Sequence, residues 1–591
     1  MLKSLLQGYD VEGQKVDYIS LQAAIANIKK AGDDSMETRA ESLAASFVES
    51  KNRNVWGSFY GPMYTFKNKE TGEPVYVPDI SEINADIIDY WSQRAIDAVN
   101  PLLKMRYSGL VWEFSKRITG KEPSYNDIKV AHINACVDAV RGDYAEHAVV
   151  GITYGKRAIE AAISIGNQEL VDESIKTLID YTRNYAADNK AGIWGSVFRL
   201  MLNHMNWFSV YEDDILEEHI ARFERLETAV KNEAEHRDGH FRVLMNEAEL
   251  LSKYYTAKKN LSQAKHYLDS LLGHLRSLYS TQGGMWSQTT IMHLQTLYRQ
   301  SHLDSEANRL YIDIQSLGAS VISEMRPISV PIQIDKADIE KYTQGIIGKE
   351  EHETLTNYIV SNVPYLSRER ELQKQEESAS SITSLMTTIV YNYAGVPVNM
   401  IPGGELAKEA KFLNGIYRRM TLHSYFMRLH INKMEELGIY TLDRLLEAFK
   451  DNLFIEECKR PLFERGLKSY FEGDYAVACS LLVPQFESAI RNIVALTGDD
   501  VLRPSKNPKE GNEYKSLEAL FDTLDKHLIV GKDVVMYFRI LFTDKYGWNV
   551  RNLISHGLLP ADQLNQAVAD RIIHAFLVLT KITFPATKNE E

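Results

Sequence analysis

The chain has 591 residues, of which 67 are basic and 80 acidic, so its formal net charge is −13. An apolar fraction of 44% and a charged fraction of 25% are ordinary for globular proteins, which excludes a wholly disordered chain. The negative charge also excludes a protein that coats duplex DNA, because such proteins need a broad basic face to displace counterions.

Three cysteines stand far apart, at Cys136, Cys458 and Cys479. They form no C-x-x-C pair, so the sequence predicts neither a disulfide framework nor a thiolate zinc site, which fits a reducing cytoplasm. The N-terminal apolar stretch is too short for a signal peptide, and no run of about eighteen apolar residues occurs. We therefore expect a soluble cytoplasmic protein that makes no contact with a membrane.

Apolar residues recur at three- and four-residue spacing along most of the chain, which predicts an all-α, multidomain protein. The pattern begins at residues 19–31 and 36–51, breaks over 56–80, and resumes from about 81 to 282. The break is rich in Gly, Pro and aromatic residues. It predicts a loop that holds a short hairpin across residues 70–72.

From about residue 145, helix pairs follow one another with short breaks, at residues 166–168 and at 259–260. Small and aromatic residues alternate around the second break, at Ala248, Tyr255, Ala264 and Tyr267. This arrangement resembles stacked helical hairpins of the tetratricopeptide kind. Because no fixed period is present, a plain helical bundle is an equally good interpretation.

Two further breaks suggest how the chain is divided. Residues 327–334 alternate proline with β-branched residues, and residues 391–405 are rich in Gly and Pro, so neither stretch continues a helix. We predict three regions: an N-terminal helical region over 1–335, a middle helical region over 336–460 and a C-terminal bundle over 461–591.

Several candidate motifs fail on inspection. Residues 151–157, GITYGKR, have too few residues between the glycines for a P-loop, and Arg replaces its Ser or Thr. His236 and His240 lack the HExxH pattern of zinc enzymes and are interpreted as polar surface. His423 and His430 lie between apolar residues and are interpreted as core histidines. We therefore predict no metal and no cofactor.

The C-terminal region contains one distinctive motif, GWNVRNLISHG, at residues 547–557. Arg551 and His556 form an R-x4-H pair, and Asn552 follows the arginine directly. The pair by itself is common, but the added asparagine and the glycine after the histidine make the combination rare. We therefore take Arg551, Asn552 and His556 as candidate site residues.

The local pattern places this motif at the end of a helix. Asn549, Asn552 and His556 are spaced to share one helix face. Gly557 is a natural left-handed residue after a helix, so His556 falls in the last turn, where the negative helix end favours a cation. The motif thus predicts a polar site at a helix C-terminus.

An arginine, a polar residue and a histidine at this spacing on a late helix resemble the HEPN superfamily (higher eukaryotes and prokaryotes nucleotide-binding domains). The motif is similar to the G-x-N-x-R-N-x-x-x-H-G pattern of an uncharacterised bacterial subgroup. Residues 473–494 are similar to the long early helix of that subgroup, and Glu487 and Arg491 form an i,i+4 pair on it. The resemblance covers about residues 461–585.

The resemblance implies metal-independent RNA cleavage, in which the ribose 2′-hydroxyl attacks the adjacent phosphorus and leaves a cyclic phosphate. His556 would act as base or acid, Arg551 would bind the phosphate and Asn552 would orient one of them. Asn549 and Gly557 would support the site. The resemblance further implies a homodimer, regulation by the N-terminal region, and a setting in toxin or antiviral defence systems.

RNA binding must be local, because residues 461–591 hold 15 basic and 17 acidic residues, a balance of −2. The candidate RNA-binding residues are Arg503, Lys506, Lys509 and Lys515. Two alternatives stay open. The bundle binds RNA or nucleotide without cleavage or only dimerises, so that the chain is an interaction or scaffold protein; or His556 merely ends a helix. The sequence identifies no regulatory protein partner.

Overall fold

The computed structural model describes residues 1–49, 54–68, 71–232, 237–329, 331, 333–379, 386–404, 407–505, 511–526 and 530–582. The chain divides into two compact units, Met1–Ile314 and Gln315–Glu591. In the described part, helices dominate and strands form only two-stranded sheets, which confirms the predicted all-α fold. None of the described helices has the length and apolar character needed to cross a membrane.

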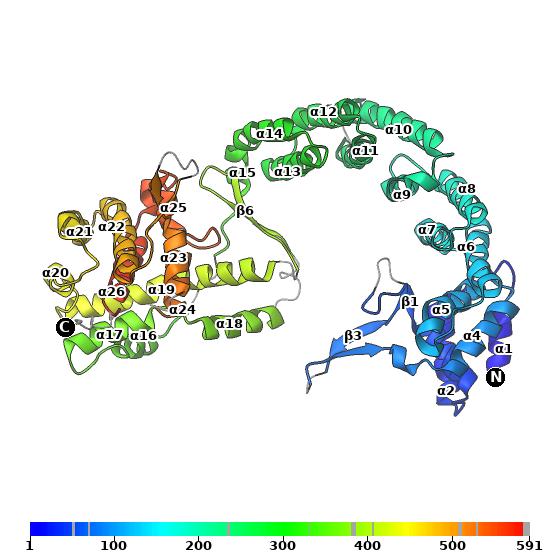
Figure 1. Cartoon of the computed structure of the whole chain (residues 1–591), viewed down its shortest axis with the longest axis horizontal. Helices are drawn as coiled ribbons and strands as arrows, with labels where there is room; N and C mark the ends of the chain where they lie inside the picture. Colours follow the sequence, from blue (N-terminus) through cyan, green and yellow to red (C-terminus); the bar gives the residue numbers. More distant parts are fainter. Residues whose placement is uncertain are drawn as a thin grey trace. The chain divides into compact units, whose positions relative to one another are not determined.

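The first unit starts with three helices and two small antiparallel hairpins and continues as a succession of helices (Figure 1). Its helices are α1 Leu2–Tyr9, α2 Tyr18–Lys30, α3 Met36–Ser46, α4 Ala85–Asp97, α5 Pro101–Thr119, α6 Ala131–Arg141, α7 Ala148–Ile165, α8 Gln168–Tyr185, α9 Ala191–Asn203, α10 Glu212–Asn232, α11 Arg237–Ala257, α12 Leu261–Leu278, α13 Gly284–Gln300 and α14 Asp304–Ser316. Its strands are β1 Val48–Glu49, β2 Tyr60–Gly61, β3 Tyr64–Lys67 and β4 Pro74–Val77. The β3–β4 pair confirms the predicted hairpin, although Glu70 itself lies outside the described residues.

Local sequence signals set the helix ends. Helix α7 ends at Gly166, whose φ of 66° is left-handed, and Asn167 then caps α8 by accepting a hydrogen bond from the Leu170 amide at 3.2 Å. Asn260 caps α12 in the same way through the Gln263 amide. Both predicted breaks are therefore confirmed.

The helices of the first unit stack along the chain. From α4 to α13 each helix contacts the next, and α6 with α8, α7 with α9, and α9 with α11 are also in contact. Small residues allow this close packing: a Cβ on Gly155 would lie 2.6 Å from Leu178. Tyr255 and Tyr267 stack with ring centroids 5.7 Å apart, beside the fully buried Ala264. The predicted succession of stacked helical hairpins is present.

In the second unit, α22 and α26 contact each other and together contact α17, α19, α21, α23, α24 and α25 (Figure 1). Its helices are α15 Gly318–Glu324, α16 Lys336–Gln344, α17 Glu351–Ser361, α18 Leu366–Ala379, α19 Lys408–Glu436, α20 Leu442–Phe449, α21 Arg460–Phe471, α22 Tyr475–Leu496, α23 Leu517–Lys526, α24 Lys532–Phe542, α25 Val550–Ser555 and α26 Gln566–Leu579. Its strands are β5 Thr388–Tyr391, β6 Pro397–Ile401, β7 Leu502–Pro504 and β8 Asn512–Tyr514, paired as β5–β6 and β7–β8.

One hydrophobic core runs through this unit, from Ile346 to Leu579. It includes Phe486 of α22 and Phe576 of α26, whose rings meet edge to face with centroids 5.4 Å apart. The boundaries predicted near residues 335 and 460 both fall inside this unit. The predicted division of the chain at these two positions therefore stays a prediction.

Candidate functional site

The motif of residues 547–557 follows helix α24 and spans the short helix α25. Gly547 passes so close to α24 that a Cβ on it would lie 2.2 Å from the carbonyl oxygen of Ile540. The Trp548 amide donates a hydrogen bond to the same oxygen at 2.7 Å. Only glycine fits this approach, which explains the residue at the first position of the motif.

Three polar side chains of the motif form a hydrogen-bonded row. Asn549 occupies the position before α25 with a left-handed φ of 52°, which asparagine tolerates better than most residues. Its side-chain oxygen accepts a hydrogen bond from the side-chain Nδ2 of Asn552 at 2.7 Å. The Asn552 oxygen in turn accepts one from Nη1 of Arg551 at 3.1 Å. The asparagines therefore share one face, as predicted, and they also orient the arginine.

Helix α22 holds Arg551 from a second direction. The Nε of Arg551 donates a hydrogen bond to one carboxylate oxygen of Glu487 at 2.8 Å. The other carboxylate oxygen accepts one from Arg491 at 3.0 Å. The Arg491 guanidinium also lies 5.1 Å from the ring centroid of Tyr514. One half-buried carboxylate thus serves two guanidinium groups, so the three side chains carry a net charge of +1.

His556 stands outside this network. It follows the last helical residue of α25, its side chain is exposed, and its imidazole makes no hydrogen bond or ion pair within the described part of the chain. Gly557 after it has a φ of 64°, which confirms its predicted role as the left-handed residue that ends the helix. The structure therefore joins Arg551, Asn552 and Asn549 and leaves His556 open to an incoming group.

Of the predicted RNA-binding residues, Arg503 lies on strand β7 and Lys515 directly follows strand β8. Arg503 forms an ion pair with Glu513 at 3.1 Å, directly across the hairpin, so its charge is locally balanced. The backbone carbonyl of Lys515 accepts a hydrogen bond from Arg491 at 3.1 Å, which links the hairpin to the Arg551 cluster. Lys506 and Lys509 lie outside the described residues.

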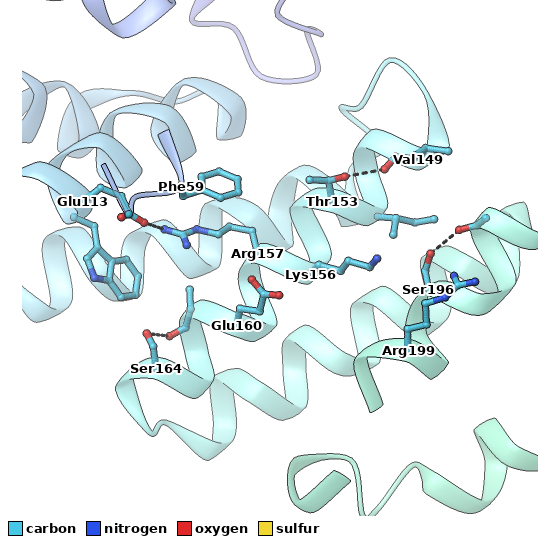
Figure 2. Close-up of a pocket in the computed structure, with 15 residues that line it drawn as sticks. Phe59, Glu113, Val149, Thr153, Lys156, Arg157, Glu160, Ser164, Ser196 and Arg199 are labelled. Atoms are coloured by element: carbon cyan, nitrogen blue, oxygen red, sulfur yellow. Dashed lines mark hydrogen bonds and ion pairs between the residues drawn. The ribbon is translucent and has the colours of Figure 1, made fainter. Parts of the chain in front are cut away.

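A cavity of about 550 Å³ lies in the first unit, against α5, α7 and α9 (Figure 2). The rejected P-loop motif proves to be part of α7, and its last two residues, Lys156 and Arg157, line this cavity. The charged lining residues are Glu113, Lys156, Arg157, Glu160 and Arg199. Three cations and two carboxylates therefore face one space, which suits a polar ligand or a charged peptide segment.

Arg157 is already engaged on one side of this cavity. Its Nη2 donates to Glu113 at 2.6 Å, its Nε donates to His132 at 3.3 Å, and its guanidinium covers the Phe59 ring at 4.4 Å. Burial, reinforced by the charge of Arg157, lowers the pKa of His132 to about 3, so that ring is a neutral acceptor. Figure 2 shows Lys156 extending the other way, toward Ser196 and Arg199.

Within the described residues, no group of three or more His, Cys, Asp or Glu side chains is placed to hold a metal ion. No known protein family, curated protein or solved structure matches the chain. The resemblance to the HEPN superfamily therefore stays a prediction made from residues 473–494 and 547–557.

Proposed function

We propose that the second unit is a metal-independent endoribonuclease whose active site contains Arg551 and His556. One observation supports this proposal above the others. Glu487 and Asn552 fix the guanidinium of Arg551, while His556, one turn further along, is exposed and without a partner. Metal-independent cleavage of RNA requires an oriented cation and an available imidazole, and the motif supplies one of each.

The proposed reaction needs one base, one acid and one cation. His556 takes the proton of the ribose 2′-hydroxyl while that oxygen attacks the adjacent phosphorus. Arg551 donates hydrogen bonds to the non-bridging oxygens, whose negative charge grows in the transition state. The bond from phosphorus to the 5′-oxygen then breaks, and this oxygen receives a proton from the acid. The products are a 2′,3′-cyclic phosphate and a free 5′-hydroxyl.

A homodimer supplies the missing acid. Each chain has one copy of the R-N-x3-H-G motif, and an isologous pair of chains would place two histidines in one cleft, one as base and one as acid. The exposure of His556 in the single chain supports such an arrangement, because the residue is available to a second copy and to RNA.

The decisive experiment incubates the purified full-length chain with single-stranded RNA in excess EDTA. We expect products that end in cyclic phosphate, and we expect His556→Ala to abolish them. His352→Ala is the matched control, because His352 is an exposed histidine of the same unit outside the motif. Equal cleavage by His556→Ala and the wild type would show that the proposed active site is wrong.

The cavity of the first unit favours a second function, in which the stacked helices bind a polar ligand or partner. This function is compatible with a nuclease regulated by its N-terminal region, or with a scaffold that never cleaves. The RNA incubation in EDTA distinguishes the regulated nuclease from the scaffold. If neither wild type nor His556→Ala cleaves RNA and both are dimers by light scattering, the chain is an interaction protein.

A further inference from the structure

A second cavity, of about 510 Å³, lies wholly within the second unit, away from the residues of the motif. Helices α16 to α19 and α26 contribute its walls. We call it the arginine pocket, after the residues Asn362, Arg368, Arg419, His423, Phe426 and Arg571 that decide its chemistry. Tyr365 and Leu422, which are 40% and 53% exposed, also line it, so the pocket is reached from solvent.

Arg571 gives the pocket a buried cation without an anion. Its side chain is 1% exposed, and its guanidinium donates to the carbonyl oxygens of Asn362 and Met420 at 3.0 and 3.2 Å. Its remaining contacts are weak ones, with Ser424 and His423 at 3.5 Å. Among the described residues, no carboxylate forms an ion pair with it.

The other buried arginines of the described chain differ in this respect. Arg106 is 5% exposed and pairs with Glu49 at 3.3 Å, and Arg222 is 1% exposed and pairs with Glu247 at 2.5 Å. A buried charge without a counter-charge is costly, so proteins normally supply one. Arg571 is the exception, and it faces a cavity.

His423 is a neutral neighbour of Arg571. Burial, with the nearby charges of Arg571 and others, lowers the pKa of His423 to about 4. Because a guanidinium only donates, Nδ1 of His423 accepts from Arg571, and its Nε2 proton points to the Tyr342 hydroxyl at 3.1 Å. The histidine therefore adds no charge to the pocket.

Further polar atoms of the pocket lack partners. The Asn362 side-chain oxygen and Nη2 of Arg419 are buried without a hydrogen bond, although the rest of Arg419 is bound by Glu369 and Glu376. Arg368 is exposed and makes no hydrogen bond or ion pair within the described residues. Arg368 and Arg571 thus offer two positive charges, and Arg419 and Asn362 offer one donor and one acceptor.

The pocket also has an apolar part, although Glu369, which is paired with Arg419, lines it as well. Leu372, Met420 and Phe426 face the same space as the arginines, so a ligand needs an apolar body as well as a charged head. A volume of this size is typical of small-molecule sites, which span about 300–1,000 Å³. We propose that the arginine pocket binds an organic anion, with its carboxylate or phosphate group at Arg571 and Arg368 and its apolar body against Met420 and Phe426.

Isothermal titration calorimetry of the full-length chain tests this proposal with four probes: octanoate, octyl phosphate, octan-1-ol and inorganic phosphate. We expect saturable one-to-one binding of octanoate, octyl phosphate or both, with at least tenfold weaker binding of octan-1-ol and of inorganic phosphate. The anion that binds more tightly identifies the head group. If neither anion binds, or if octan-1-ol binds equally well, the proposal is wrong.

Variants locate the binding. Arg368→Gln should weaken binding of the anion at least fivefold, and Arg571→Met at least tenfold. Arg418→Gln, a change in an exposed arginine beside the pocket that does not line it, should leave binding unchanged. If Arg571→Met fails to fold, as judged by circular dichroism, Arg368→Gln decides alone. Binding by Arg368→Gln at wild-type strength would overturn the assignment.

Discussion

Glu487 accepts a hydrogen bond from Nε of Arg551 at 2.8 Å and so ties the long helix α22 to the short helix α25. The same carboxylate pairs with Arg491, one turn further along α22. Its position between two guanidiniums has two consequences. It fixes the direction of Arg551, and it competes with any phosphate for that arginine.

Replacing Glu487 by Gln should separate these effects. Loss of the carboxylate leaves Arg491 and Arg551 without their shared counter-charge, so we expect the second unit to lose about 1–2 kcal/mol of stability. We also expect single-stranded RNA to bind several-fold more tightly, because a phosphate no longer competes with a carboxylate. Fluorescence anisotropy at low salt measures the binding in a His556→Ala background.

Urea unfolding of 5-fluorotryptophan-labelled chain, followed by fluorine NMR, measures the stability of the second unit alone. Trp548 is the one tryptophan of the seven that lies in residues 315–591. Glu472→Gln is the matched control, since its pair with Lys468 is exposed and 3.9 Å long. That variant should lose less than about 0.5 kcal/mol. Equal losses in the two glutamate variants would contradict the role given to Glu487.

The two glycines of the motif should respond differently to a methyl group. In Gly547→Ala the new Cβ would lie 2.2 Å from a backbone oxygen, and we expect a loss of about 2–4 kcal/mol. In Gly557→Ala nothing lies within 4 Å of the Cβ, so only the left-handed φ of 64° opposes the change, by about 1 kcal/mol. The fluorine signal of Trp548 in urea measures the stability of both variants. A ranking in the opposite order would contradict the packing of Gly547 on α24.

Features set by neighbouring residues could be predicted from the sequence. The helix breaks at Gly166 and Asn260 and the left-handed Gly557 depend on a few adjacent residues, whose preferences are strong. Spacing likewise placed Asn549 and Asn552 on one face of the same short helix. Such local signals survive in the folded chain because the tertiary structure does not oppose them.

Contacts between distant residues could not be predicted in this way. Glu487 and Arg551 are 64 residues apart, and the arginine pocket joins five helices from residue 342 to residue 571. Without related sequences, nothing in a single chain shows which helices meet. One signal was available. The charged residues Asp570 and Arg571 interrupt a largely apolar segment, and charged residues in a buried helix usually have a specific partner or ligand.

Asp570 has a buried environment that makes the stability of the second unit depend on pH. It is 2% exposed, and its Oδ1 accepts hydrogen bonds from Tyr470 at 2.6 Å and Arg428 at 3.2 Å. Its Oδ2 is buried and has no partner. Burial raises the pKa of Asp570 from 3.8 to about 6, although Tyr470 and Arg428 act to lower it.

The folded chain therefore holds a proton on Asp570 between about pH 4 and pH 6 that the unfolded chain has released. The contribution of this group to stability is highest below pH 4 and falls as the pH rises to 6, by about 1–3 kcal/mol. The buried His423, His430 and His574, whose pKa values are lowered to between about 3 and 4, have the opposite sign over this range. Comparison of a variant with the wild type at each pH removes their common effect.

Asp570→Asn keeps the shape of the side chain and cannot ionise, so its stability relative to the wild type should rise as the pH increases from 4 to 6.5. The fluorotryptophan signal in urea gives this difference at each pH. Asp562→Asn is the control, because Asp562 is exposed on the connection before α26, and its difference from the wild type should stay constant. If the difference for Asp570→Asn were equally constant, Asp570 would ionise as an ordinary carboxyl, and the buried oxygen without a partner would need another explanation.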